Sequence, residues 1–249
     1  DFIYGEEWDD SYTGFTSRLT WAEESFTANL GFESNRSKMD DEIYWSDDSA
    51  WSPAGRLIRD QEREERRGLY ANATFSLGKF SLTPGLRYDY NGNSEEFISP
   101  SLGATYQLAS DTLLRASIAR GFSAPYLSAS ANSPDLDAET IWAFQGGIET
   151  GRIPYLLLKC TLFHQKVEDA WNTDTFPWND SGTIRWNGVE LEAKTVEYHG
   201  LRLTTNFTLV IEDSMGDGST NIENEETYTA NVILDYTSHE QGWRAQLAG

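Results

Sequence analysis

The residues that could carry out chemistry are present in this sequence, but their spacing does not build a catalytic site. The three histidines, His164, His199 and His239, are far apart, two of them in or beside expected short turns. Serine and aspartate are plentiful, yet there is no nucleophile elbow and no glycine-rich phosphate-binding loop. We therefore expect no enzyme activity, no catalytic residues and no cofactor.

Acidic and sulfur-bearing side chains do not predict a metal site either. The stretch DSMGDGSTNIENEE, residues 213–226, has acidic spacing that suggests calcium. It lacks the alternating oxygen ligands of an EF-hand loop, so a solvated loop is the favoured interpretation and calcium binding the alternative. The one cysteine, Cys160, falls on the apolar side of an expected strand, where it acts as a small hydrophobic residue.

The composition narrows the classes of protein and partner. The chain has 249 residues, with 40 acidic against 19 basic side chains and a net charge of -21, which argues against a nucleic-acid partner. No apolar run reaches the length of a transmembrane helix. The chain begins at Asp1 without a basic and apolar leader, so we expect any signal peptide to be removed or to lie outside this segment. Aromatic residues nevertheless make up 13% of the chain.

Strict alternation of apolar and polar residues predicts β-strands along most of the chain. In residues 226–237, the apolar face begins with Tyr228 and ends with Tyr236. Eight residue steps of about 3.3 Å span about 26 Å, close to the apolar band of an outer-membrane barrel. Pro84 and Pro100 fall inside expected strands, where they predict bulges or strand ends. The other clear strands are residues 26–35, 69–77, 80–90, 98–108, 142–148, 156–162, 189–193 and 200–212.

The connections between these strands alternate in length. Short links are expected at residues 23–25, 78–79, 109–110, 150–154, 196–199 and 238–241. Long polar links are expected at residues 36–66, 91–94, 123–138, 168–183 and 213–225. Short turns at one side and long loops at the other are typical of bacterial transmembrane barrels. A soluble β-sandwich or propeller also alternates in this way and remains an alternative at this point.

Charged side chains fall on the polar side of the expected strands. A channel lumen tolerates them, and so does a solvated sheet face, but the paired tyrosines favour the membrane. The predicted fold is therefore all-β, an antiparallel transmembrane β-barrel of about twelve strands, beginning in a loop and ending in a strand. A sheet that crosses a bilayer must close, so the chain is expected to be part of a larger barrel. The charged residues are Arg18, Arg87, Arg115, Lys159, Glu190, Glu192, Lys194 and Arg202.

Several stretches together resemble the TonB-dependent outer-membrane receptors. The family's strand–loop–strand motif is similar to two stretches of this chain, RASIARGFSAP (residues 115–125) and SPDLDAETIWAFQGGIE (residues 133–149). Ser133 stands where the family usually has Asn. LTPGLRYDY (residues 82–90), FISPSLGATYQLASDTLLRAS (residues 97–117) and WNGVELEAK (residues 186–194) resemble further barrel strands of the family.

The resemblance implies an architecture and a function. It implies a barrel of about 22 strands filled by a plug domain, of which residues 1–249 would be a partial barrel domain without the plug. It further implies active import of a scarce nutrient, a siderophore–iron complex or cobalamin, in the bacterial outer membrane. The partners would be outer-membrane lipid, the nutrient and the TonB complex, reached through the plug. A passive porin-like or structural barrel is the alternative, and a soluble all-β binding module a further one.

The resemblance also assigns roles to residues. Six charged residues would line the lumen and face the plug: Arg18, Arg87, Arg115, Glu190, Glu192 and Arg202. Aromatic and charged residues on long loops above the barrel mouth are candidate ligand contacts, although they could instead pack loops together or lie in the outer aromatic girdle. These candidates are Trp45, Trp51, Arg56, Trp171, Asp174 and Trp178. The loop at residues 123–138 is expected to be structural, with Glu139 bonding either to backbone or to an arginine such as Arg120.

Overall fold

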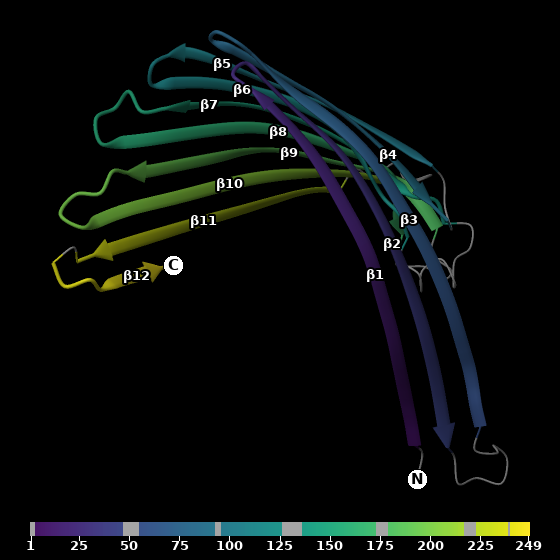
Figure 1. Ribbon diagram of the computed structural model, residues 1–249. Coiled ribbons are helices and arrows are strands. Elements are labelled where there is room, and N and C mark those ends of the chain that lie inside the picture. The colour runs from purple at the N-terminus through teal and green to yellow at the C-terminus, as the bar shows by residue number, and fades with distance from the viewer. Residues whose placement is uncertain are drawn as a thin grey trace.

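The chain forms one antiparallel sheet of twelve strands, in which each strand pairs with the next along the sequence (Figure 1). The computed structural model describes residues 3–46, 55–92, 96–125, 136–172, 179–216, 223–238 and 240–249. The sheet is strongly curved, and among these residues no pairing joins β1 to β12. The predicted all-β fold of about twelve strands is therefore confirmed, as an open part of a barrel.

The strands have the following bounds. They are β1 (Ile3–Glu23), β2 (Phe26–Ser46), β3 (Gly55–Leu77), β4 (Phe80–Asn91), β5 (Phe97–Ala109), β6 (Thr112–Ser123), β7 (Glu139–Thr150), β8 (Leu156–Asn172), β9 (Asn179–Thr195), β10 (Leu201–Gly216), β11 (Glu223–Thr237) and β12 (Arg244–Ala248). Within the described part of the chain, no helix has the length and apolarity needed to cross a membrane.

The register of the strands separates the sheet into an apolar and a polar face. Leu209 of β10 pairs with Val189 of β9 and with Tyr228 of β11, so apolar residues of neighbouring strands share one face. Polar residues such as Thr208 and Thr229 pair on the other face. Large apolar side chains stay exposed, among them Tyr228 at 75% and Leu162 at 62%. An apolar surface of this extent is suited to lipid rather than to water.

The connections alternate in length as predicted from β1 to β7, and hardly differ after it. Two residues each separate β1 from β2, β3 from β4 and β5 from β6, whereas the gaps between them at residues 47–54, 92–96 and 124–138 are longer. The later gaps, at residues 151–155, 173–178, 196–200, 217–222 and 238–243, have five or six residues each. The two-residue turns therefore lie at one end of the sheet, and the longest connections at the other (Figure 1). The first end is called the short-turn end below, and the second the long-loop end.

The first three strands are longer than the sequence indicated. β2 and β3 contain 21 and 23 residues and take up most of the region expected to be a loop at residues 36–66. They extend well beyond the other strands at the long-loop end (Figure 1). β1 also begins at Ile3, so the predicted initial loop is wrong. These extensions carry charges on both faces, which removes the alternation that reveals a strand.

Bulges occur at places other than the prolines. Register shifts lie between Ile43 and Tyr44, between Gln107 and Ala109, and between Glu168 and Trp171. Pro100 stays in register opposite Leu86, and the strands on both sides of Pro84 keep one register. The predicted bulges or strand ends at the prolines are therefore wrong. The ladder between β3 and β4 lacks the two pairs at Thr83 and Pro84, and proline has no N–H to donate there.

Gly188 of β9 is required by close packing on the polar face. A Cβ atom at this position would lie 2.3 Å from Cζ of Phe163 and 2.4 Å from the backbone oxygen of Leu209. The phenylalanine ring therefore covers the glycine, and the backbone of the next strand closes the other side. A contact with a backbone atom cannot be relieved by rotating a side chain.

We expect Gly188→Ala to lower the free energy of unfolding by about 1–3 kcal/mol, the usual cost of overpacking. Gly146→Ala is the matched control, because a Cβ there meets nothing within 4 Å. This control should stay within about 0.5 kcal/mol of the parent protein. Denaturant unfolding of the receptor in lipid vesicles, followed by tryptophan fluorescence, measures both. Equal effects of the two substitutions would contradict the packing assigned to Gly188.

Candidate functional site

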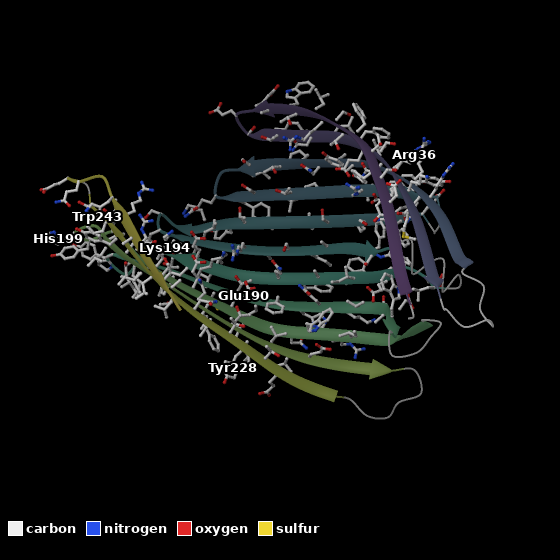
Figure 2. The ribbon with its side chains drawn as sticks, turned by 90° about the horizontal axis from the view of Figure 1, so that it is seen from below. Arg36, Glu190, Lys194, His199, Tyr228 and Trp243 are labelled. Atoms are coloured by element: carbon white, nitrogen blue, oxygen red, sulfur yellow. The ribbon has the colours of Figure 1, made fainter. Side chains whose placement is uncertain are left out.

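The polar face of the sheet gathers the charged residues that the sequence singled out. The strand register places all six predicted lumen residues on this face, across β1, β4, β6, β9 and β10. They are Arg18, Arg87, Arg115, Glu190, Glu192 and Arg202. Figure 2 shows Lys194 near the short-turn end, beside His199 and Trp243, Glu190 further along the sheet, and Arg36 at the long-loop end.

Arg87 of β4 is the centre of an ion-pair cluster. Its Nε and Nη2 atoms donate hydrogen bonds of 2.8 and 2.7 Å to the two carboxylate oxygens of Asp89, which is buried. Nη2 also donates to Glu33 of β2 at 2.9 Å. The guanidinium lies 5.8 Å from the ring centroid of Tyr70, within cation–π range. These contacts fix the guanidinium against the sheet wall and leave the cluster with one excess negative charge.

Two glycines make room for the Arg87 cluster. A Cβ at Gly31 would lie 2.1 Å from Cζ of Tyr70, so the tyrosine ring lies directly over this glycine. A Cβ at Gly68 would lie 2.5 Å from Nη2 of Arg87. The missing side chains therefore let an aromatic ring and a guanidinium lie flat against the polar face. The sequence reveals Asp89 as a partner, two residues after Arg87 on the same face, but gives no sign of Glu33.

Arg115 of β6 lies beside a depression of about 450 Å³ on the polar face. Its Nη2 donates a 2.7 Å hydrogen bond to the hydroxyl of Thr161 on β8. Gly147 lies between the two strands, where a Cβ would be 3.2 Å from Nε of Arg115. Hydroxyl and amide side chains dominate the lining, which includes Thr74, Ser81, Thr83, Thr105, Ser117 and Gln145. The depression can accept polar groups from a domain packed against this face.

Glu190 and Glu192 occupy alternate positions of β9 and so point to the same face. Glu190 pairs with Thr161 and with Thr208, while Glu192 pairs with Lys159 and Asn206. Glu190 is exposed and Glu192 half-buried. Among the described residues, no hydrogen bond or ion pair involves either carboxylate. Two carboxylates about 7 Å apart along the strand can bind one cationic group between them.

The remaining two predicted lumen residues differ in their surroundings. Arg202, near the short-turn end, lies 3.7 Å from Glu197. Arg18 is exposed on the edge strand β1 and pairs with Gly31. Side-chain hydrogen bonds cross the first three strands close to it, from Thr20 to Asn29 at 2.7 Å and from Asn29 to Asn72 at 2.9 Å. The polar face is thus bonded laterally as well as through the backbone ladder.

The predicted ligand residues are placed only in part. Trp45 pairs with Tyr4 near the end of β2, and Arg56 pairs with Tyr44 near the start of β3, both at the far tip of the long extension. Trp51, Asp174 and Trp178 lie outside the described residues. The structure therefore brings Trp45 and Arg56 to neighbouring strands at the long-loop end. Their role in binding stays a prediction.

Trp171, the sixth ligand candidate, anchors the end of the loop that precedes β7. Its backbone N–H donates to Glu139 at 3.0 Å, and its indole Nε1 donates to the backbone oxygen of Asp137 at 2.8 Å. Leu136 and Ala138 are buried beside this anchor. Of the two partners predicted for Glu139, backbone is the one observed. The described end of the loop is thus structural.

Among the described residues, which do not include His239, histidine and cysteine form no metal cluster. In the ranges that the structure describes, no group of three or more His, Cys, Asp or Glu side chains could hold a metal ion. Cys160 lies on the apolar face opposite Ile148. His164 lies on the same face, where Nδ1 is 2.7 Å from Oδ1 of Asn187. This polar pair on the apolar face could not be predicted from the sequence, because strand pairing brings the two residues together.

Known proteins share this architecture. Over 173 residues, the chain is 28% identical to the vitamin B12 transporter BtuB of Vibrio vulnificus (strain CMCP6), an alignment covering 68% of this chain and 27% of BtuB. Its fold resembles the copper transporter OprC, with a TM-score of 0.78 at 14% identity over 98% of this chain and 43% of OprC. It also resembles the ferric enterobactin receptor PfeA of Pseudomonas aeruginosa, with a TM-score of 0.71 at 21% identity, over 93% of this chain and 39% of PfeA.

The family match covers more of the chain than these individual proteins do. The chain spans between about a quarter and two fifths of the length of BtuB, OprC and PfeA. The family described as "TonB dependent receptor-like, beta-barrel" matches residues 1–249. The resemblance of the barrel-strand motifs to TonB-dependent receptors is therefore confirmed. The members of this family are receptors and transporters of the bacterial outer membrane, and the chain belongs to the TonB-dependent receptor family.

Proposed function

We propose that this chain forms the middle of the barrel of an outer-membrane receptor that actively imports a scarce nutrient, a siderophore–iron complex or cobalamin. The observation that carries the proposal is the family match over residues 1–249. Two properties of the sheet support it, an exposed apolar face suited to lipid and an opposite face that is polar and charged. Energy for import would come from the inner membrane through TonB.

The polar face would be the wall of the lumen. Residues 1–249 form a partial barrel domain in this proposal, and the plug domain packs against its charged side chains. Arg115 and its hydroxyl-lined depression can accept carboxylates or backbone oxygens of the plug. Glu190 and Glu192 can accept a guanidinium or ammonium group. The lumen set is Arg18, Arg87, Arg115, Glu190, Glu192 and Arg202.

The long-loop end would capture the nutrient from outside the cell, since outer-membrane barrels have short periplasmic turns and longer extracellular loops. Trp45 and Arg56 lie on neighbouring strands at the tip of the longest extension, which supports a contact role for them. The proposed contacts are Trp45, Trp51, Arg56, Trp171, Asp174 and Trp178. A guanidinium group such as that of Arg56 binds anionic groups of a metal chelate through charge-assisted hydrogen bonds.

Energised transport and passive permeation give different results in one experiment. The receptor gene is expressed in cells that lack their own receptors for radiolabelled cobalamin and ferric enterobactin, with and without functional TonB. We expect uptake of one of these probes to fall to background when TonB is absent, because the plug blocks passive flow. Uptake that is equal in both strains and proportional to concentration would support the passive porin instead.

A further inference from the structure

The depression beside Arg115 lies on the polar face, in the half of the sheet that is nearer the short-turn end. Its lining comes from neighbouring strands between β3 and β8 (Figure 1). Arg115 is three residues from the start of β6, and Thr161 is five residues from the start of β8. At about 3.3 Å for each residue, both lie about 10–17 Å from the short-turn end of their strands. This site, called the Arg115 depression below, is therefore remote from the long-loop end.

The described residues that line the Arg115 depression carry one positive charge and no negative charge. Nη2 of Arg115 donates its 2.7 Å hydrogen bond to the hydroxyl of Thr161, a side chain that is only 5% exposed. A buried hydroxyl fixes the position of the guanidinium, but it does not cancel the charge. The remaining N–H groups of a guanidinium can each donate a further hydrogen bond.

Two carboxylates lie near Arg115 in the strand register, but neither is part of the lining. Glu149 follows Gly147, the residue opposite Arg115, by two positions on β7, and it pairs with Lys159. Glu190 pairs with Thr161 from β9. Within the described ranges, no ion pair joins Arg115 to either carboxylate. The guanidinium is thus open to an anion that comes from outside the sheet.

Other arginines of the polar face have a carboxylate in contact. Arg87 lies 2.7 Å from Asp89, and Arg202 lies 3.7 Å from Glu197. These pairs neutralise their guanidinium groups within the sheet itself. Arg115 differs from them because its partner is a neutral hydroxyl.

The size of the Arg115 depression suits a small molecule better than one side chain. Its volume of about 450 Å³ falls within the range of about 300–1,000 Å³ that is usual for ligand sites. A carboxylate group fills little more than one or two water molecules, each about 30 Å³. Hydroxyl and amide groups such as those of Thr83 and Gln145 surround the space, and they both donate and accept hydrogen bonds.

We propose that the Arg115 depression is a transit site for an anionic metal chelate, which binds there after it has passed the plug. The inference rests on the proposed function and narrows it, because the nutrient is then an anionic siderophore–iron complex and not cobalamin. The guanidinium and the hydroxyls donate hydrogen bonds to the anionic oxygens of the chelate. One cation among neutral groups, with Glu190 beside Thr161, binds an anion weakly enough to release it, as passage through a channel requires.

The test begins with the kind of nutrient. In cells that lack their own receptors for the two probes, we expect TonB-dependent uptake of radiolabelled ferric enterobactin, an anionic chelate, and only background uptake of cobalamin. TonB-dependent uptake of cobalamin would overturn the anionic transit site and leave energised import standing. Uptake that does not need TonB, or uptake of neither probe, would reject the proposed function and the transit site with it.

Substitution of Arg115 then separates transit from capture. Arg115→Gln should lower TonB-dependent uptake of ferric enterobactin about tenfold, because the charge-assisted hydrogen bonds are lost. Binding of ferric enterobactin to the purified receptor should stay within about twofold of the parent protein, since the substitution is remote from the long-loop end. Arg115→Lys keeps the charge but loses the planar fork, so its uptake should fall only about threefold.

Arg152→Gln is the matched control, since this arginine is 73% exposed and lies 3.9 Å from Asp111 at the short-turn end. It should change neither binding nor uptake. Heat-modified migration on gels verifies that every variant is folded.

Conductance in planar bilayers separates transit from plug contact. It should stay at the closed level in Arg115→Gln, because the other charged lumen residues keep the plug seated. A rise in conductance would assign Arg115 to the plug, and a loss of binding equal to the loss of uptake would assign it to capture. Either result, or normal uptake in Arg115→Gln, would overturn the transit site without affecting the proposed function.

Discussion

Replacing Val232 with arginine should lower the free energy of unfolding by about 2–4 kcal/mol, the cost of a cation on the lipid side at mid-bilayer. Val232 is 50% exposed on the apolar face, midway between Tyr228 and Tyr236, the two tyrosines that mark the ends of the apolar band on β11. Leu203 of β10 lies on the same face two residues from the short-turn end, so arginine there should cost less. Unfolding by denaturant in lipid vesicles measures both changes.

The control is the adjacent residue on the same strand. Asn231→Arg places the same charge at the same height on the polar face, opposite Asn206. We expect a change within about 0.5 kcal/mol, because this face accepts charge at many positions. If Asn231→Arg and Val232→Arg cost the same, the assignment of lipid and lumen faces is wrong. In detergent micelles, arginine at Val232 or at Leu203 should lower the free energy of unfolding by less than in vesicles, since the apolar layer of a micelle is more deformable.

The double variant Glu190→Gln with Glu192→Gln should reduce energised nutrient uptake at least tenfold. In the proposed receptor, these carboxylates accept a cation of the plug in a site shielded from water. Removing one partner of such a charge pair costs about 2–5 kcal/mol, or at least a tenfold loss of a properly seated plug. TonB-dependent uptake of the nutrient measures the loss of transport. The conductance of single receptors in planar bilayers measures the loss of a seated plug, and it should rise because the plug no longer closes the lumen.

The barrel itself should be unaffected by this double variant. Among the described residues, neither carboxylate takes part in a hydrogen bond or an ion pair that holds the sheet together. Unfolding of the receptor in vesicles should therefore match the parent protein. Glu240→Gln, an exposed residue in the turn between β11 and β12, is the control and should change neither uptake nor conductance. Normal uptake in the double variant would remove these carboxylates from the proposed plug contact.

Alternation made the middle of the sheet predictable. The alternation alone predicts strands at residues 80–90 and 226–237, and both are strands with the expected faces. The apolar side of such a strand faces lipid or a core, and its polar side faces water or a lumen. Apolar and polar residues therefore alternate with a period of two along the strand. The same logic fails in the extensions of β1, β2 and β3, where both faces are polar and no period remains.

The candidate site was predictable as a face but not as a set of contacts. Arg87 and Arg115 could be assigned to the polar side from their strands. Their partners Glu33 and Thr161 lie 54 and 46 residues away, so only strand pairing brings them together. The anchor formed by Trp171 and Glu139 is similar, because it joins the end of one strand to the start of another 32 residues earlier.

The sequence by itself determined the strand period, the two faces, the alternation of turns and the family. These properties are local, because each depends on the chemistry of residues a few positions apart. The tertiary structure decided how far β2 and β3 extend, which glycines lie beneath Tyr70 and Phe163, and which charges share a height on one face. Those properties depend on the register between strands, and register joins residues that the chain keeps far apart.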